Sequence, residues 1–282
     1  VVAAMTDPNP LVAGQGMARL AAAKVQTETL SPDSDIARQA RELNVGFFNR
    51  MEHGLPWVRL KVAASLDGQT ALQNGQSQWI TGPQARADGH AWRARACAIL
   101  TGIGTVLEDD PQLNVRGLEV PRQPHLVVVD SRLDMPLTAK LLDTQGAGEQ
   151  ARQIWVYTAT PDQADKRAAL TARGVTVIDC PGASGKVDLS AMLRDLARRE
   201  INELHLAAGH KLNGSFLREG LVDECLLYLA PKMLGQGSGV AQFGPLTRLS
   251  EGLALGFHEV ERVGADLRIV ARVNGRDAFL HS

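Results

Sequence analysis

The chain of 282 residues is poor in cysteine, and its cysteines and histidines are scattered. Cys97, Cys180 and Cys225 lie far apart and form no CxxC pair, which argues against a disulfide framework and against a compact zinc site. The seven histidines form no HxH or HExxH group. We therefore expect no metal to be bound by this sequence, and we interpret the cysteines as small core residues.

An excess of charge and a long apolar run are also missing. The formal net charge is -1, so we expect no nucleic acid and no anionic membrane as a partner, and any anion site must be local. No apolar run reaches the roughly 18 to 20 residues of a membrane span, and the start VVAAMTDPNP lacks the basic region of a signal peptide. The composition is that of a globular, cytoplasmic protein with one large or two modest domains.

The stretch LKVAASLDGQTALQNGQSQWITGPQARAD, residues 60–88, carries the clearest functional signal. It begins as a strand in which Lys61 is a single cation among apolar neighbours. A lysine in that position is either buried near a charged ligand or placed at an exposed edge. Thr81 is predicted to be the N-cap of the following helix, with Pro83 in its first turn.

Three basic residues share one face of this helix. Arg86, His90 and Arg93 are spaced by four and three residues, a spacing that aligns side chains on a helix. Arg93 and Arg116 could hold a phosphate with paired hydrogen bonds, and the alternative is a solvated helix face and loop. A cationic stripe near a strand lysine suits a phosphorylated small molecule.

From Trp57 onward, short β-branched strands alternate with helices or polar connectors. The pattern predicts an α/β fold with a mainly parallel sheet and a closing antiparallel hairpin formed by residues 253–260 and 267–273. The apolar strand Cys225–Ala230 could form a subunit interface, and we expect a homo-oligomer. The other strands after residue 90 are expected over residues 98–100, 125–130, 154–158, 175–179 and 203–207.

The first 45 residues do not resemble the start of a domain. Residues 1–5 are predicted to form a buried strand, and a short helix is expected over residues 17–23. A second helix is expected over residues 35–48, followed by a boundary near residues 54–56. The apolar face of that helix would consist of Ile36, Ala40, Leu43 and Phe47.

Two strand ends lead through glycine turns into helices, at residues 100–105 and 207–215. Backbone N–H groups at a helix N-terminus bind phosphate without basic side chains. Neither turn has the GxGxxG pattern of the usual dinucleotide site, and each alone is more simply explained as turn chemistry. Two such turns in one sheet favour a nucleotide.

Three other residues have two interpretations each. Ser131 and Arg132 follow a buried strand where a 2′-phosphate would lie, which favours NADPH, whereas Asp130 before them could simply close a turn. Trp79 could flank a nicotinamide, but core packing is the favoured interpretation. Asp109 most simply ends a helix before Pro111.

Five segments, in their order and spacing, resemble the reductase domain of the bifunctional riboflavin-biosynthesis pyrimidine deaminase/reductase. They are KVAASLDGQTA, GQSQWITG, AILTGIGTVLEDDPQL, VVVDSR and AAGHKLNGSFL. The resemblance covers about residues 57–234 and implies the fold of dihydrofolate reductase. Residues 1–30 are similar to the tail of the family's zinc deaminase domain, but the His-Ala-Glu and paired cysteines that would hold zinc are absent. The expected organisation is a remnant of a cytidine-deaminase-like α/β domain at 1–45, a linker at 46–56 and a reductase domain at 57–282.

The resemblance also implies an activity and a set of site residues. The enzyme would reduce the ribose of a phosphoribosylamino-pyrimidine to a ribityl chain with NADPH, and zinc would belong only to a deaminase half outside this sequence. Lys61 is our hypothesis for the residue that polarises or protonates the sugar. The implied substrate-binding residues are Lys61, Ser77, Arg93, Leu113, Arg116 and Ala207. The implied cofactor-binding residues are Ala63, Trp79, Thr105, Asp109, Ser131, Gly209, His210, Lys211, Leu212, Asn213, Gly214 and Ser215.

One position departs from the family pattern. This chain has Ala207 where the family usually carries a glutamate expected to bind substrate, so weaker substrate binding is expected. Two alternatives stay open: a pterin or folate reductase of the same fold, and a non-catalytic or impaired scaffold that need not bind the nucleotide. No isolated acid in the early strand supports the first, and Ala207 motivates the second.

Overall fold

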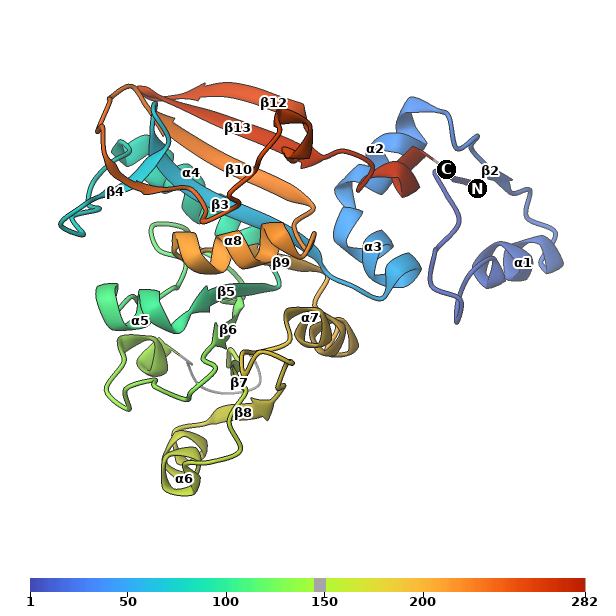
Figure 1. Cartoon of the computed structure of the whole chain (residues 1–282). Coiled ribbons are helices and arrows are strands. Elements are labelled where there is room, and N and C mark those ends of the chain that lie inside the picture. Colours follow the sequence, from blue (N-terminus) through green and yellow to red (C-terminus); the bar gives the residue numbers. More distant parts are fainter. Residues whose placement is uncertain (145–150, 282) are drawn as a thin grey trace.

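The computed structural model describes residues 1–144 and 151–281, and a nine-stranded sheet organises them (Figure 1). The strand order is β12-β13-β10-β3-β9-β5-β6-β7-β8, parallel from β10 to β8, with β13 and β12 added antiparallel. The predicted parallel sheet and closing hairpin are confirmed. The strands are β3 (Trp57–Ser65), β5 (Ala98–Gly102), β6 (His125–Val129), β7 (Ile154–Thr158), β8 (Val175–Asp179), β9 (Glu203–Leu206), β10 (Glu224–Ala230), β12 (Leu255–Val263) and β13 (Asp266–Val273).

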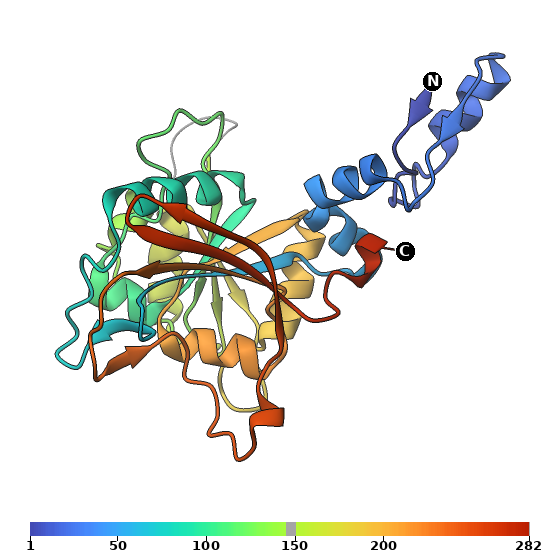
Figure 2. The same ribbon diagram turned by 90° about the horizontal axis from the view of Figure 1, so that it is seen from above.

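Helices cover both faces of the sheet, which explains why its central strands are apolar on both sides (Figure 2). One face packs against α7 (Leu189–Arg198) and α8 (His210–Arg218) through Leu193 and Phe216. The other face packs against α4 (Pro83–Arg95), α5 (Ile103–Asp109) and α6 (Ala164–Ala172). A small second sheet pairs β4 (Gln69–Leu72) with β11 (Gly237–Gly239), and short 3-10 turns lie at Lys140–Thr144, Leu249–Glu251 and Ala278–His281.

The start of α4 differs from the prediction by one residue. Gly82, not Thr81, is the N-cap, and no side chain of the cap accepts a hydrogen bond from the helix. The Gly82 amide instead donates to Oδ2 of Asp266 on β13 at 2.7 Å. Pro83 occupies the first helical position, as predicted. A carboxylate distant in the sequence therefore fixes where the helix begins.

The N-terminal segment contradicts two predictions. It contains β1 (Val2–Ala3) paired in parallel with β2 (Glu28–Thr29), α1 (Gln15–Ala22), α2 (Asp35–Leu43) and α3 (Val45–His53). Residues 1–5 are not a buried strand, because Val1 and Val2 are 62% and 61% exposed. The predicted helix over residues 35–48 is interrupted at Asn44 and turned about its axis, so that Ile36 and Leu43 are exposed while Ala37 and Arg41 are buried. Figure 2 shows residues 1–30 projecting from the rest of the molecule.

Helix α3 covers most of the stretch that was predicted to be a linker. Its Val45 and Phe48 pack with Trp57 at the start of β3 and with Phe279 near the C-terminus. The rings of Trp57 and Phe279 meet edge to face with centroids 6.1 Å apart. The segment before the sheet is thus attached to it by a small apolar cluster, and the division of the chain into domains stays a prediction.

Strand β10, which was considered as a subunit interface, lies inside the sheet and is paired with β3 and β13. Its edges are therefore not free. The exposed large apolar side chains of this region belong to the edge strand β12 and include Phe257 at 76% exposure. Within residues 1–144 and 151–281, no helix is long and apolar enough to cross a membrane. The same residues contain no cluster of three or more histidine, cysteine or acidic side chains that could hold a metal ion.

Candidate functional site

Lys61 lies on the central strand β3, half-buried beneath α4. Its Nζ atom is 5.7 Å from the centroid of the Tyr228 ring. The helix lies close to this side chain, since a Cβ added at Gly89 would be 3.9 Å from Cε of Lys61, an ordinary van der Waals contact. Burial and the nearby Arg93 lower the pKa of Lys61 from 10.5 to about 8. Of the two interpretations of Lys61, the structure therefore selects burial among charged groups.

Other cations gather around Lys61. Burial and Arg116 lower the pKa of Arg93 to about 10, and burial with Arg93, Arg116 and Lys61 lowers the pKa of His90 to about 4. Among the described residues, no carboxylate contributes to the pKa shifts of Lys61, His90 and Arg93. A cluster of positive charges without counterions is costly unless an anion is bound. We call Lys61, His90, Arg93 and Arg116 the cationic cluster.

The loop after α5 forms one wall of the cationic cluster. Asp110 and Leu113 have positive φ angles of 41° and 49°, which side-chain-bearing residues rarely adopt. Nη1 of Arg93 donates to the Asn114 carbonyl at 2.9 Å, and the Arg116 amide donates to Nδ1 of His90 at 3.2 Å. Helix α4 therefore holds this loop in its strained conformation.

Arg152, which the sequence did not single out, holds the same loop from the other side. Its side chain is 2% exposed and donates to the Leu113 carbonyl at 3.0 Å and to the Pro124 carbonyl at 2.7 Å. Burial and Arg93 lower its pKa to about 10. The side chain of Leu113 is buried in the core, so this residue presents backbone rather than side chain to the cluster.

The residues implied for the cofactor end four neighbouring strands. Ala63, Gly209, Thr105 and Ser131 lie on or just beyond the carboxyl ends of β3, β9, β5 and β6, in that spatial order. A Cβ added at Gly209 would lie 4.0 Å from Oγ1 of Thr105, so the two glycine turns are adjacent. The carboxyl edge of a parallel sheet is where open α/β folds bind ligands. The predicted pairing of the two turns is thus present.

Several implied cofactor residues have other contacts. His210–Ser215 lie in the first turns of α8, where Nδ2 of Asn213 donates to the Val240 carbonyl at 2.9 Å. A Cβ at Gly214 would lie 2.1 Å from the Gln242 carbonyl oxygen, so both residues face that segment. Asp109 is the last residue of α5, at the opposite end from the glycine turn.

The turn after β6 agrees in part with the simpler interpretation, in which Asp130 closes a turn. The buried Asp130 carboxylate accepts hydrogen bonds from the amides of Asp134 and Met135, both at 2.8 Å. Oγ of Ser131 accepts from the Val187 amide at 3.1 Å, and Arg132 pairs with Asp134 at 3.0 Å. Asp130 therefore shapes the turn that presents Ser131 and Arg132.

Trp79 does not fill the core, and the favoured interpretation of it was wrong. The residue is 65% exposed, with the Arg86 guanidinium 4.5 Å from its ring centroid. Arg86 is thereby drawn away from the stripe that it was predicted to share with His90 and Arg93, and its Nη1 donates to the Thr81 carbonyl at 2.7 Å. Ser77 is half-buried in the segment between β4 and α4.

Ala207 joins the two halves of the site. It directly follows β9, packs with Leu113 in one apolar cluster, and stands two residues before Gly209. The strand that leads to the Gly209 turn is paired with the strand of Lys61, with Leu206 opposite Leu60. The fold and these residues define an α/β protein with a candidate anion site beside a candidate nucleotide site.

Comparison with known proteins agrees with this class. A family model for the RibD C-terminal domain matches residues 56–269. The riboflavin biosynthesis protein RibD of Haemophilus influenzae is 37% identical over 98% of this chain and 73% of its own length, and that of Escherichia coli is 37% identical over 95% and 72%. The chain belongs to the RibD family and contains its C-terminal reductase domain.

Solved structures give the same result. Acinetobacter baumannii RibD superposes with a TM-score of 0.83 at 37% identity, covering 97% of this chain and 72% of that one. A deaminase/reductase from Thermotoga maritima has a TM-score of 0.78 at 24% identity, which supports the fold alone. The dihydrofolate-reductase-like fold implied by the sequence is confirmed.

Proposed function

We propose that this chain reduces the ribose of 5-amino-6-(5-phosphoribosylamino)uracil to the ribityl side chain, with NADPH as hydride donor. The observation that carries the proposal is the cationic cluster, which has no carboxylate partners among the described residues and whose Lys61 follows Leu60, the residue paired with Leu206 on the strand that leads to the Gly209 turn. A sugar phosphate would supply the missing negative charge. Membership of the RibD family supports the same activity.

On the substrate side, each residue has a separate task. Arg116 is exposed and can swing onto a phosphate, while Arg93 is held by Asn114 and offers its remaining donors from a fixed position. The backbone of the loop from Leu113 to Arg116, which Arg152 and α4 hold in place, would set the distance between phosphate and sugar.

Lys61 would supply the proton. Its lowered pKa of about 8 leaves Nζ protonated in much of the population at neutral pH, yet able to release the proton to a sugar oxygen or nitrogen. Its position beside α4 leaves the Lys61 side chain half-buried, which limits its contact with bulk water. Lys61 and Ala63 are two residues apart on β3 and therefore lie on the same face of the sheet. The proton donor would thus be next to a residue implied to bind the cofactor.

The residues at the carboxyl edge fit a dinucleotide. Thr105 and Gly209 would hold its phosphates through the paired helix starts, and Ser131 with Arg132 would face a 2′-phosphate. When bound, NADPH would supply the hydride. Zinc deaminase chemistry is not assigned to this chain, since residues 1–45 carry neither the His-Ala-Glu motif nor a cysteine pair.

The test is a turnover assay on the deaminated substrate, monitored by loss of NADPH absorbance, together with titration of NADPH fluorescence. We expect saturable NADPH binding and ribityl product. Nucleotide binding without turnover would favour an impaired enzyme, and absence of both would favour a scaffold. Reduction of a dihydropterin in place of the sugar would favour the pterin or folate reductase.

Restoring a carboxylate at residue 207 should strengthen substrate binding. Ala207→Glu places a negative charge beside Leu113 and near the cationic cluster, where a buried hydrogen-bonding partner contributes about 1 to 3 kcal/mol. We expect the Michaelis constant for the substrate to fall by about fivefold or more, while the dissociation constant of NADPH stays unchanged. Equal Michaelis constants for the two proteins would show that the alanine has no consequence.

We propose that the chain self-associates through the edge strand β12. Its register with β13 aligns Leu255, Phe257 and Val260 on one face, where they are 41%, 76% and 52% exposed. Phe257→Asp should weaken association by about 2 kcal/mol or more, measured by sedimentation velocity over a range of concentrations. Leu249→Asp, at an exposed residue outside β12, is the control and should leave association unchanged. A wild-type chain that is monomeric at every concentration would exclude this interface.

A further inference from the structure

A histidine behind Lys61 has no assigned role. His205 lies on β9 opposite Arg59 of β3, so its side chain is on the same face of the sheet as Arg59 and Lys61. It is 0% exposed. Within the described part of the chain, neither of its ring nitrogens has a hydrogen-bond partner. Buried polar groups in native proteins are nearly always paired, so a site with two free ring nitrogens calls for a partner.

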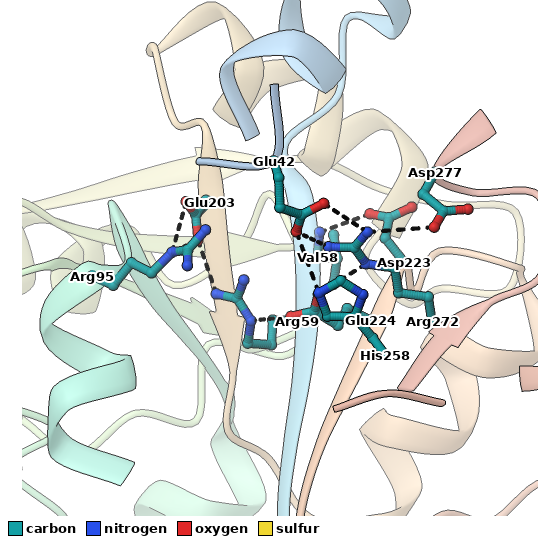
Figure 3. Close-up of polar contacts among 10 residues, drawn as sticks. All are labelled: Glu42, Val58, Arg59, Arg95, Glu203, Asp223, Glu224, His258, Arg272 and Asp277. Carbon is teal, nitrogen blue, oxygen red and sulfur yellow. Dashed lines mark hydrogen bonds and ion pairs between the residues drawn. The ribbon is translucent and has the colours of Figure 1, made fainter. Parts of the chain in front are cut away.

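The charges around Arg59, the residue opposite His205 on β3, are already paired, as Figure 3 shows. Arg59 donates from Nε to Glu224 and from Nη1 to Glu203, the latter at 2.9 Å. Glu203 also pairs with Arg95 at 2.9 Å, and Glu224 with Arg272 at 3.3 Å. Arg272 in turn donates to Glu42 of α2. Two of the five N–H donors of Arg59 are thereby used, and its guanidinium is held between two carboxylates.

The charges around Lys61 are not paired. Lys61 has no carboxylate among the described groups that set its pKa, and the buried Nε of Arg93 has no partner among the described residues. Burial together with Arg93, Arg59 and Lys61 lowers the pKa of His205 far below 6.5, so its ring is neutral. A neutral imidazole offers one acceptor nitrogen. Two donors are candidates for it: the Lys61 ammonium, which stands on a flexible stem, and Nε of Arg93, whose guanidinium is fixed through Nη1 to the Asn114 carbonyl.

We propose that His205 is a positioning residue, whose acceptor nitrogen receives a hydrogen bond from the Lys61 ammonium, directly or through one buried water, and aims it at the sugar. The inference rests on the proposed function, in which Lys61 delivers the proton. The apolar neighbours of Lys61 on adjacent β10 and α4, Leu226 and Gly89, offer no side-chain acceptor. His205 is thus an acceptor without a partner on the strand that neighbours β3.

Two variants separate positioning from packing. His205→Leu keeps a buried side chain but removes the acceptor, and His205→Asn keeps an acceptor. We expect His205→Leu to lower kcat about tenfold, which corresponds to about 1.4 kcal/mol, with little change in the KM for NADPH. His205→Asn should recover most of the loss. Equal kcat values for wild type and His205→Leu, or an equal loss in both variants, would overturn the proposal.

The pH profile gives a second kinetic readout. An acceptor stabilises the protonated form of Lys61, so its removal should move the basic limb of the kcat profile to lower pH. The other charged or titratable groups around Lys61 are unchanged in these variants; they are Arg59 on β3, His90 and Arg93 on α4, Arg116 in the loop and Tyr228 on β10. An unmoved basic limb in His205→Leu would contradict the proposal.

A readout independent of turnover separates this inference from the proposed function. The ¹⁵N resonances of the His205 ring, assigned by comparison with His205→Asn, are recorded in the full chain with NADP⁺ and ribose 5-phosphate. The unprotonated nitrogen should carry the upfield shift of a hydrogen-bonded acceptor, and Lys61→Met should abolish that shift. An identical spectrum in Lys61→Met would overturn the contact even if the wild type is active. A wild type without turnover that keeps the contact would refute the proposed function alone.

Discussion

Replacing Lys61 with methionine is expected to lower kcat by about 100-fold or more, because a positioned proton donor contributes about 10² to 10⁴ in rate. Methionine fills similar space under α4 and keeps the apolar part of the contact with Tyr228. The measurement is steady-state reduction at saturating substrate and NADPH. Turnover that survives while only substrate binding weakens would assign Lys61 to binding and remove it from the proton transfer.

Lys61→Met should not destabilise the fold, because burial of the charged lysine is unfavourable. The pH dependence of the unfolding free energy tests this reason. The pKa of Lys61 is lowered from 10.5 in the unfolded chain to about 8 in the folded protein, so between these values the unfolded chain holds more protons. Wild-type stability therefore contains a gain as pH rises from about 8 to 10.5, and Lys61→Met lacks it. The advantage of the variant should be largest below pH 8 and disappear toward pH 10.5, measured by urea unfolding.

Replacing Arg59 with methionine should have the largest effect on stability, a loss of about 3 to 5 kcal/mol in the free energy of unfolding. Arg59 is 1% exposed and lies between Glu203 and Glu224 (Figure 3). Its removal leaves two buried carboxylates close together, each with one cation fewer. Urea unfolding followed by circular dichroism measures the loss as a lower midpoint at an unchanged slope.

Arg95→Met is the matched control for Arg59→Met. Arg95 pairs with the same Glu203, but its side chain is 38% exposed, so its removal should cost less than about 1 kcal/mol. Burial raises the pKa of Glu224, but its pairs with Arg59 and Arg272 outweigh burial and lower the pKa overall. The stabilisation from these pairs is thus present above the unfolded value of 4.5 and is lost as pH falls. Equal losses in the two variants at neutral pH would contradict the role given to burial.

The order of strands and helices after Trp57 could be predicted because local and tertiary preferences agree there. Segments such as Ile154–Thr158 and Val175–Asp179 are rich in β-branched residues and are separated by a helix, which is the pattern of a parallel sheet. The closing hairpin also carries its own turn at Gly264, with a φ angle of 64°. The sequence pattern is sufficient to predict the strands and helices where the intrinsic preference of each residue matches its environment in the fold.

The failures have tertiary causes. The N-cap of α4 moved to Gly82 because Asp266, far along the chain, binds that amide. The buried face of α2 includes Arg41, whose guanidinium donates to the Pro32 carbonyl, so apolar spacing alone chose the wrong face. Trp79 is exposed, and its ring lies against the Arg86 guanidinium rather than in the core. None of these partners can be identified from local sequence.

Only two parts of the site could be predicted from the sequence: the basic residues near Lys61 and the two glycine turns. Arg152 and His205 are single polar residues in apolar surroundings, and their roles depend on strand register and on a loop more than thirty residues away in sequence. Before the register between β3 and β9 is known, nothing connects His205 with Lys61. An isolated polar residue in a predicted strand is the signal that could have pointed to His205, whereas Arg152 lies before the strand Ile154–Thr158 and carries no such signal.

The attachment of α2 and α3 has a practical consequence for recombinant work. The family model begins at residue 56, which invites expression of the reductase from that point. A protein cut there would lack Glu42, which neutralises Arg272, and would uncover the Trp57 and Phe279 rings that Phe48 shields. Expression from Ser34 onward would retain both partners, and its soluble yield should exceed that of the shorter fragment.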